Sequence, residues 1–396
     1  MRDALLLRNA RIVLTDSTTG PTSVLIEDGR VARVFDSSEI PPASSQIVDL
    51  TGLTLFPGFI DIHIHGSASV DTMDTTADGL HKIAVFLRNN GVTAWVPTLV
   101  PASAEGYERA IRAISDVIDD QKARLPIPEA RTLGVHYEGP FVNNQQCGAL
   151  HREYFRTFET IEDINSLPTL SETNAIHLMT LAPEIVGGIA LIEELTKRNW
   201  ITSIGHTRAT TDTLDFALAA GARHMTHFMN AMTPLHHRAP GPVDWGLMND
   251  QVTCDLIADG IHLDPSILKL ILRNRTSKRV SLISDAIAAT GLGDGEYQIW
   301  GETIAVKDGR TRNSHGSIAG SVITMLDAAR MMLALGFSES EVAQMAALNP
   351  ARLLKLDHDC GSIEAGKRAD LIALDDERRV RLTIIGGQIA FQDLPS

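Results

Sequence analysis

The chain has 396 residues, of which 44% are hydrophobic and 21% are charged, a composition typical of soluble globular proteins. Its 49 acidic and 35 basic residues give a net charge of −14, and no run of Lys or Arg stands out. We therefore expect neither nucleic acid nor an anionic membrane as a partner.

The start of the chain does not resemble a targeting segment. The apolar run at residues 4–7 is too short for a signal peptide, and no stretch approaches the roughly 18 apolar residues of a membrane helix. The three cysteines, Cys147, Cys254 and Cys360, lie far apart and form no CxxC motif. This pattern favours a reducing compartment, so we expect a cytoplasmic protein.

Both ends of the chain are rich in short β-type runs. The first 57 residues contain several, separated by turn signals such as Asp28-Gly29, and residues 356–396 resume the pattern. Neither end looks large enough to bury a core alone. We therefore expect residues 1–57 and 356–396 to pair into one small β-sandwich domain, leaving 58–355 as a second domain.

Residues 58–355 alternate short apolar strands with longer helical stretches, such as 79–91 and 189–199. The predicted strands, eight in all, are residues 58–66, 93–100, 132–141, 175–184, 200–207, 224–231, 252–262 and 279–287. After the eighth strand we expect helices within 321–336 and 339–356. Such alternation predicts a parallel sheet, and eight units predict an α/β fold of the (β/α)₈ TIM-barrel type. A doubly wound sheet is the alternative, but no glycine-rich phosphate motif follows the first strand.

Polar residues gather at the carboxyl ends of the predicted strands, which face one mouth of a barrel. They are His63 and His65 on the first strand, Glu138 on the third, His206 on the fifth, His227 on the sixth and Asp285 on the eighth. A single one of these could be a hydrogen-bonded core histidine or a helix cap. Together they are the ligand types of zinc and similar ions, and period-two alternation lets His63 and His65 share one ion. The set therefore predicts a metal site.

Longer motifs give a resemblance to a known family. The segments "PGFIDIHIHG" and "GSIEAGKRADLIALD", with Asp285 after the eighth strand, resemble the amidohydrolase superfamily. Within it, "GVHYEGPF", "SIGHT", "THFMNAM", "IADGIHLD", "SDAIAATG" and "GSIAGS" are similar, in order, to the N-acetylglucosamine-6-phosphate deacetylases. Dihydroorotases and hydantoinases share HxH but bridge their metals with a carboxylated lysine on strand four. The fourth strand here, "AIHLMTLAPE", has no lysine, and Glu138 can take that role.

This resemblance implies a role for each candidate residue. Glu138, His206 and His227 would bind one divalent metal. Some members of the family have replaced the HxH pair and use that metal alone, whereas this chain keeps His63 and His65, so one or two metals per chain are implied. We expect Zn²⁺, although Fe²⁺ or another transition metal also fits. Asp285 would act as general base and then as general acid. The implied substrate site comprises Asn230, Ala231, Arg238 and His262 around the sugar phosphate, and Ala149, Ile318, Ala319 and Gly320 around the sugar.

One loop departs from the family pattern. After the bridging Glu the family usually has Gly, a small residue and then His, whereas this chain reads "CGALHRE". Leu150 therefore precedes His151. If His151 polarises the acetyl carbonyl, the loop must bulge by one residue.

The resemblance implies hydrolysis of N-acetylglucosamine 6-phosphate to glucosamine 6-phosphate and acetate by a homodimer. One alternative is another N-acyl substrate, such as N-acetylgalactosamine 6-phosphate or a cyclic amide. A non-catalytic barrel scaffold is the other. Arg238 and His262 favour a phosphorylated substrate, and retention of all six metal and base candidates argues against a scaffold. Nothing in the sequence separates the gluco from the galacto sugar.

Overall fold

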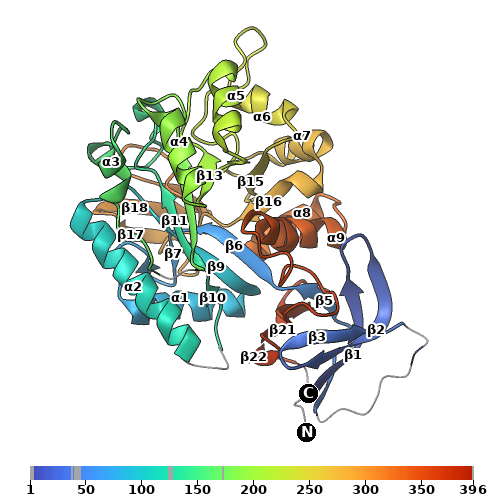
Figure 1. Ribbon diagram of the computed structural model, residues 1–396. Helices are drawn as coiled ribbons and strands as arrows, with labels where there is room; N and C mark the ends of the chain where they lie inside the picture. The colour runs from blue at the N-terminus through green and yellow to red at the C-terminus, as the bar shows by residue number, and fades with distance from the viewer. Residues whose placement is uncertain (1–3, 37–38, 40–45, 124–127, 172–173, 395–396) are drawn as a thin grey trace.

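The computed structural model describes residues 4–36, 39, 46–123, 128–171 and 174–394. Eight parallel strands form a nearly closed barrel in the middle of the chain, as predicted (Figure 1). They are β6 (Phe59–Ile64), β9 (Val92–Leu99), β11 (Gly134–Glu138), β12 (Ile176–Leu181), β13 (Ile201–Ile204), β14 (His224–Met225), β15 (Thr253–Ile257) and β16 (Val280–Ile283). The two-residue strand β10 (Arg131–Thr132) also pairs with β9. Each strand coincides with one predicted from the sequence.

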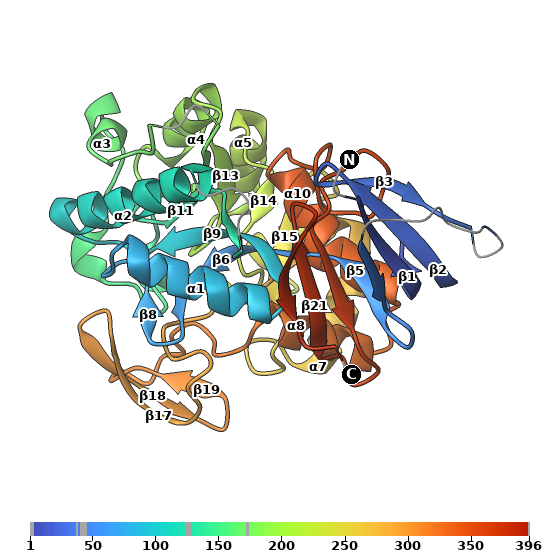
Figure 2. The same cartoon turned by 90° about the horizontal axis from the view of Figure 1, so that it is seen from below.

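Helices surround the barrel (Figures 1 and 2). They are α1 (Ala77–Asn89), α2 (Ala104–Ala123), α3 (Ile161–Asn165), α4 (Gly188–Lys197), α5 (Thr211–Ala220), α6 (Pro242–Met248), α7 (Pro265–Arg275), α8 (Met325–Ala334), α9 (Glu339–Ala343) and α10 (Asn349–Leu353). Local chemistry fixes several of their starts. Asp264 caps α7 by accepting from Ser266 N, and Pro265 occupies the first turn, where no amide donor is needed. Within the described ranges, none of the helices is long and apolar enough to span a lipid bilayer.

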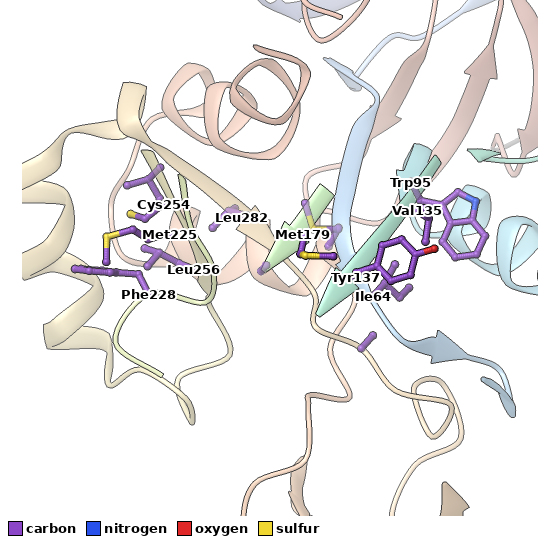
Figure 3. Packing of buried hydrophobic residues seen from close by; sticks show 14 of the residues in the cluster. Ile64, Trp95, Val135, Tyr137, Met179, Met225, Phe228, Cys254, Leu256 and Leu282 are labelled. Atoms are coloured by element: carbon purple, nitrogen blue, oxygen red, sulfur yellow. The ribbon is translucent and has the colours of Figure 1, made fainter. Parts of the chain in front are cut away.

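The main apolar core lies between the barrel strands and these helices. Figure 3 shows part of it, where Trp95, Val135 and Tyr137 from neighbouring strands pack together. Helix α1 contributes Leu80 and Ile83 to the same cluster. Because the strands are covered, they read as continuous apolar runs, which is why the sequence distinguished them from half-exposed strands.

The two chain ends meet in one antiparallel-rich sheet beside the barrel (Figure 2). Its order is β22 (Gln388–Gln392), β21 (Val380–Ile385), β20 (Leu371–Leu374), β5 (Thr54–Pro57), β1 (Ala4–Val13), β2 (Thr18–Glu27) and β3 (Arg30–Val34), with β4 (Gln46–Asp49) also paired to β1. Side chains from the N-terminal and the C-terminal strands of this sheet share one apolar cluster, among them Leu7, Val24, Leu371 and Leu382. The pairing of the ends follows the prediction, whereas the domain boundaries at 57 and 356 stay a prediction.

A small antiparallel sheet was missing from the predicted order of elements. It comprises β17 (Gly295–Ile299), β18 (Glu302–Lys307) and β19 (Arg310–Arg312), between the eighth barrel strand and α8. In Figure 2 it lies below the barrel, near the short hairpin of β7 (Gly66–Ser67) and β8 (Val70–Asp71). Ile299 and Ile304 pack against Ile287 and Ala319, which ties the sheet to the loop after β16.

Candidate active site

Two groups of buried side chains lie at the carboxyl ends of the barrel strands. Within each group the candidate ligand atoms lie within 4.8 Å of one another. One group is His63, His65 and Asp285, and the other is Glu138, His206 and His227. The structure thus brings together all six residues that the sequence predicted for the metal site.

The Glu138 carboxylate lies between the two groups. Its Oε1 is 2.9 Å from His206 Nε2 and 3.0 Å from His227 Nε2. On the other side, Oε2 is 3.3 Å from His65 Nε2, and Oε1 is 3.6 Å from His63 Nε2. One carboxylate can therefore offer an oxygen to each side, which is the geometry that a bridging ligand needs.

The imidazole nitrogens converge closely. His206 Nε2 and His227 Nε2 are 3.1 Å apart, and His63 Nε2 and His65 Nε2 are 3.2 Å apart. Each of these nitrogens also faces a carboxylate; His65 Nε2, for example, is 3.2 Å from Asp285 Oδ1. A nitrogen has one site for either a proton or a lone pair, so protons alone cannot satisfy all these contacts. A cation bound among these nitrogens and oxygens would satisfy them all. This set of imidazole and carboxylate donors fits a divalent metal ion.

Electrostatics set the protonation of the central carboxylate. Burial alone would raise the pKa of Glu138. The charge of His63 and the hydrogen bonds from His206 and His227 outweigh burial and hold that pKa well below its usual range. Glu138 is therefore ionised and available as a ligand.

The histidines respond in the opposite direction. Burial opposes a charged imidazole, yet contacts with Asp285 and Glu138 raise the pKa of His65 to about 10. Burial would likewise lower the pKa of His227, but the hydrogen bond and the charge of Glu138 raise it to about 9. Burial would raise the pKa of Asp285, but His63 and His65 lower it. Without a cation, these imidazoles hold protons that balance the carboxylates.

Three of the six residues adopt a left-handed backbone conformation. The φ angle is 47° at His206, 31° at His227 and 50° at Asp285. Non-glycine residues rarely have positive φ, and such strain often accompanies functional sites. Tertiary hydrogen bonds hold these turns: Asn143 N donates to His206 O, and Ser321 N donates to Asp285 O. The fold therefore maintains a strained backbone so that these side chains point into the barrel mouth.

Comparisons with known proteins agree with this geometry. Residues 54–390 match the model of the Amidohydrolase family. The chain belongs to the amidohydrolase family. It is 35% identical to N-acetylgalactosamine-6-phosphate deacetylase from Escherichia coli O157:H7 (97% of this chain, 98% of the relative). It is 34% identical to N-acetylglucosamine-6-phosphate deacetylase from Lysinibacillus sphaericus, with 98% of each chain covered.

Two solved amidohydrolase structures extend this similarity to three dimensions. N-acetylglucosamine-6-phosphate deacetylase from Thermotoga maritima superposes with a TM-score of 0.87 at 32% identity, covering 98% of this chain and 100% of the other. A mutant of N-acetyl-D-glucosamine-6-phosphate deacetylase from Mycobacterium smegmatis was solved in complex with N-acetyl-D-glucosamine 6-phosphate. It superposes with a TM-score of 0.88 at 31% identity, covering 98% of this chain and 99% of the other.

A cavity of about 360 Å³ opens above the metal-site residues of this amidohydrolase. The predicted substrate residues in its wall are Ala149, Asn230, Ala231, His262, Ile318 and Gly320. His262 is held in place by Asp259, whose Oδ2 lies 2.6 Å from His262 Nδ1. The cavity thus has apolar, amide and imidazole groups around the clustered carboxylates.

Three other predicted residues lie outside the wall of this cavity. Arg238 is exposed in the loop between β14 and α6, and Ala319 is buried in the apolar cluster with Ile287. His151 lines a neighbouring cavity of about 760 Å³, with its Nδ1 3.3 Å from Glu153 Oε1. Leu150, the preceding residue, lines the cavity of about 360 Å³ instead. The roles of these residues stay predictions.

Sequence reasoning missed several polar residues that support the cluster. Asp255, on β15, accepts a hydrogen bond from His227 N and lies 3.0 Å from His224 Nε2. The ring of His136, on β11, packs edge-to-face against the ring of His63, with the ring centroids 4.6 Å apart. Burial and the neighbouring charge of His63 hold the pKa of His136 well below its usual value, so this imidazole is neutral. Period-two alternation with Glu138 was the signal that could have identified His136.

Asp61 is a further buried carboxylate that the sequence did not single out. Its Oδ2 accepts from Ser284 Oγ at 2.5 Å, which links β6 to the loop after β16. Burial raises the pKa of Asp61 to about 6, although bonds from Ser284 oppose the rise. Asp61 lies two residues before His63, on the same face of the strand.

Proposed function

We propose that this amidohydrolase hydrolyses the acetamide of N-acetylglucosamine 6-phosphate, yielding glucosamine 6-phosphate and acetate. The observation that carries the proposal is the Glu138 carboxylate, which lies between two histidine groups at the floor of a cavity suited to a sugar. Full-length relatives named as deacetylases of this substrate support the choice of reaction. A neighbouring structure holds this sugar phosphate, which supports the choice of ligand.

The proposed metal site has two parts. Glu138, His206 and His227 would hold one divalent ion, and His63 and His65 a second with Asp285 nearby. Zn²⁺ suits imidazole and carboxylate ligands, and Fe²⁺ shares them. Such an ion would lower the pKa of water toward about 7 and polarise the acetyl oxygen.

Asp285 is the proposed proton carrier. Its low pKa keeps it ionised at neutral pH, so it can accept a proton from the attacking water. It can then return that proton to the sugar nitrogen, which makes the amine a better leaving group. Its position beside His63 and His65, at 3.4 and 3.2 Å, puts the base next to the proposed metal site.

The substrate would lie with its phosphate toward Asn230, Ala231 and His262, which follow β14 and β15. A chain of net charge −14 repels a phosphorylated sugar unless the mouth supplies local donors. We propose Arg238 as a further phosphate partner, because its loop follows the same strand. His151 lines the neighbouring cavity, so as the proposed partner of the acetyl carbonyl it requires the bulge of its loop that would bring it past Leu150 into the catalytic cavity.

Two further parts of the proposal concern the cell and the assembly. A phosphorylated sugar does not cross a bilayer unaided, which supports a cytoplasmic enzyme.

We also propose a homodimer, for which the exposed Phe216 on α5 and Met248 on α6 offer apolar contact surface. Light scattering of the purified protein tests this part.

An acetate-release assay tests the reaction. The panel is N-acetylglucosamine 6-phosphate, its galacto isomer, and both sugars without phosphate. We expect the gluco phosphate to be preferred, and activity to disappear on chelation and return with added metal. The galacto isomer is the second candidate, because one relative at 35% identity carries that name. Preference for an unphosphorylated sugar would refute the phosphate assignments.

A further inference from the structure

Trp300 occupies an unusual position for a bulky side chain. It is the first of two residues in the turn between β17 and β18, where Ile299 pairs with Glu302. Both turn residues have positive φ, 54° at Trp300 and 78° at Gly301, as a type I′ turn requires. The corresponding turn between β18 and β19 uses Asp308-Gly309, the composition that such turns favour. An aromatic residue held in this conformation suggests that its side chain is required.

The indole ring of Trp300 packs against the candidate active site. It meets the imidazole of His65 edge-to-face, with ring centroids 5.2 Å apart and an interplanar angle of 84°. It also packs against the apolar cluster that includes Ile287 and Ala319, as Ala149 does. These contacts fix the ring at the β6 side of the barrel mouth.

The same ring separates two cavities. Trp300 lines the catalytic cavity of about 360 Å³, together with Leu150 and Asp285. It also lines the neighbouring cavity of about 760 Å³, whose wall includes the apolar residues Val100 and Pro101. Trp300 is the residue that the described walls of both cavities share, which places it between them. Removing the indole would therefore extend the catalytic cavity into space that is already present.

The proposed substrate orientation gives this wall a role. The phosphate lies toward Asn230 and His262, and the reacting amide must reach Glu138 and Asp285. The carbons of the acyl group then extend toward β6, where the indole of Trp300 lies against His65. We propose that Trp300 forms the end of the acyl pocket and restricts the enzyme to short acyl groups, chiefly acetyl. This inference rests on the proposed function and names the acyl class of its substrate.

The experiment compares three substrates: the N-acetyl, N-propionyl and N-butyryl derivatives of glucosamine 6-phosphate. One added methylene in a tight pocket changes kcat/KM by roughly 10–200-fold, so we expect the parent enzyme to reject butyryl strongly. Trp300→Gly and Trp300→Asn both suit a turn with positive φ. We expect each to raise the butyryl-to-acetyl ratio of kcat/KM at least about tenfold. The matched control is Asp308→Gly, in the next turn of the same sheet, which should leave the ratio unchanged.

Other results of this experiment would overturn either the role of Trp300 or the proposed function. An unchanged ratio in a variant that still hydrolyses the acetyl substrate would overturn the acyl wall and leave the proposed function intact. Loss of folding, or of activity toward all three substrates, in both variants would also overturn it, because Trp300 would then support His65 rather than limit the acyl group. If the parent enzyme itself releases no acid from any of the three, the proposed function fails, whatever the variants do.

Discussion

Asp255 offers a direct test of how the barrel prepares its metal site. This carboxylate is buried and is not among the described residues that line the cavity at the barrel mouth, yet it accepts from His227 N and lies beside His224 Nε2. Its contact with His227 holds the backbone at a φ of 31°, a value that the side chain of His227 needs in order to face Glu138. Asp255→Ala removes both contacts and leaves two buried polar groups unpaired.

The size of the effect follows from these contacts. A hydrogen bond to a charged group contributes about 1.5–3 kcal/mol, so losing two should lower the free energy of unfolding by about 3–6 kcal/mol. Groups that orient a metal ligand typically change metal affinity by about 10–100-fold when they are removed. Asp255→Asn keeps an oxygen for His227 N, so its loss of metal affinity should be smaller than that of Asp255→Ala.

The assay is a competition titration of metal against a chelator, paired with urea unfolding of the metal-free protein. Asp215→Ala is the matched control, because it also removes a carboxylate acceptor, here the partner of Trp245 Nε1 between helices α5 and α6, away from the metal-site residues. That variant should lose some stability but retain its metal affinity. If Asp255→Ala bound metal as tightly as the parent, the assignment of Asp255 as a positioning residue would be wrong.

The remaining predictions concern the cluster itself. Glu138→Gln should lose metal from both parts of the site, and elemental analysis that found full occupancy would exclude Glu138 as a bridge. Asp285→Asn should lower kcat by roughly 10²–10⁴-fold while metal is retained, and a near-normal rate would contradict its role as base. Because the pKa is about 10 at His65 and about 9 at His227, both are protonated in the metal-free chain at pH 7.5. Metal binding should therefore release protons and weaken as pH falls, and calorimetry that gave equal heats in two buffers of different ionisation enthalpy would refute this.

Much of the site could be predicted because a barrel constrains it strongly. Parallel strands of a closed sheet place their carboxyl ends at one mouth, so any polar residue at such an end lies near the others. His206 and Asp285 were identified in this way, although they are 79 residues apart (285 − 206). Neither their rotamers nor the loop conformations had to be known. The same reasoning extends to the strands, whose buried surfaces require continuous apolar runs.

Features that depend on loop packing could not be predicted. The sequence cannot decide whether Leu150 or His151 faces the cavity, because these neighbours exchange places with a small change in the loop backbone. The β17–β19 sheet was missed although Asp308-Gly309 is a strong hairpin signal, since Trp300-Gly301 does not resemble a turn. Asp255 was missed because a lone carboxylate inside an apolar strand gives no pattern. Its importance comes from its contact with the backbone of His227, in the segment that follows β14.

The closure of the barrel and the assembly of the site involve the same atoms. Strands β6 and β16, the first and the eighth, are joined where Asp285 N donates to His63 O and His65 N donates to Ala286 O. These bonds involve the predicted HxH pair and the predicted base, so the site cannot form unless the barrel closes. Conversely, a metal that binds only the folded chain stabilises it by RT ln(1 + [L]/Kd), or about 4.1 kcal/mol at a thousandfold excess over Kd. Because the two ends of the barrel sheet meet at this site, metal binding would strengthen the closure between its first and last strands. The fold imposes a strained backbone on Asp285, which costs stability. A metal ion bound at this site would stabilise the same fold and offset that cost, so the strain is compatible with a stable enzyme.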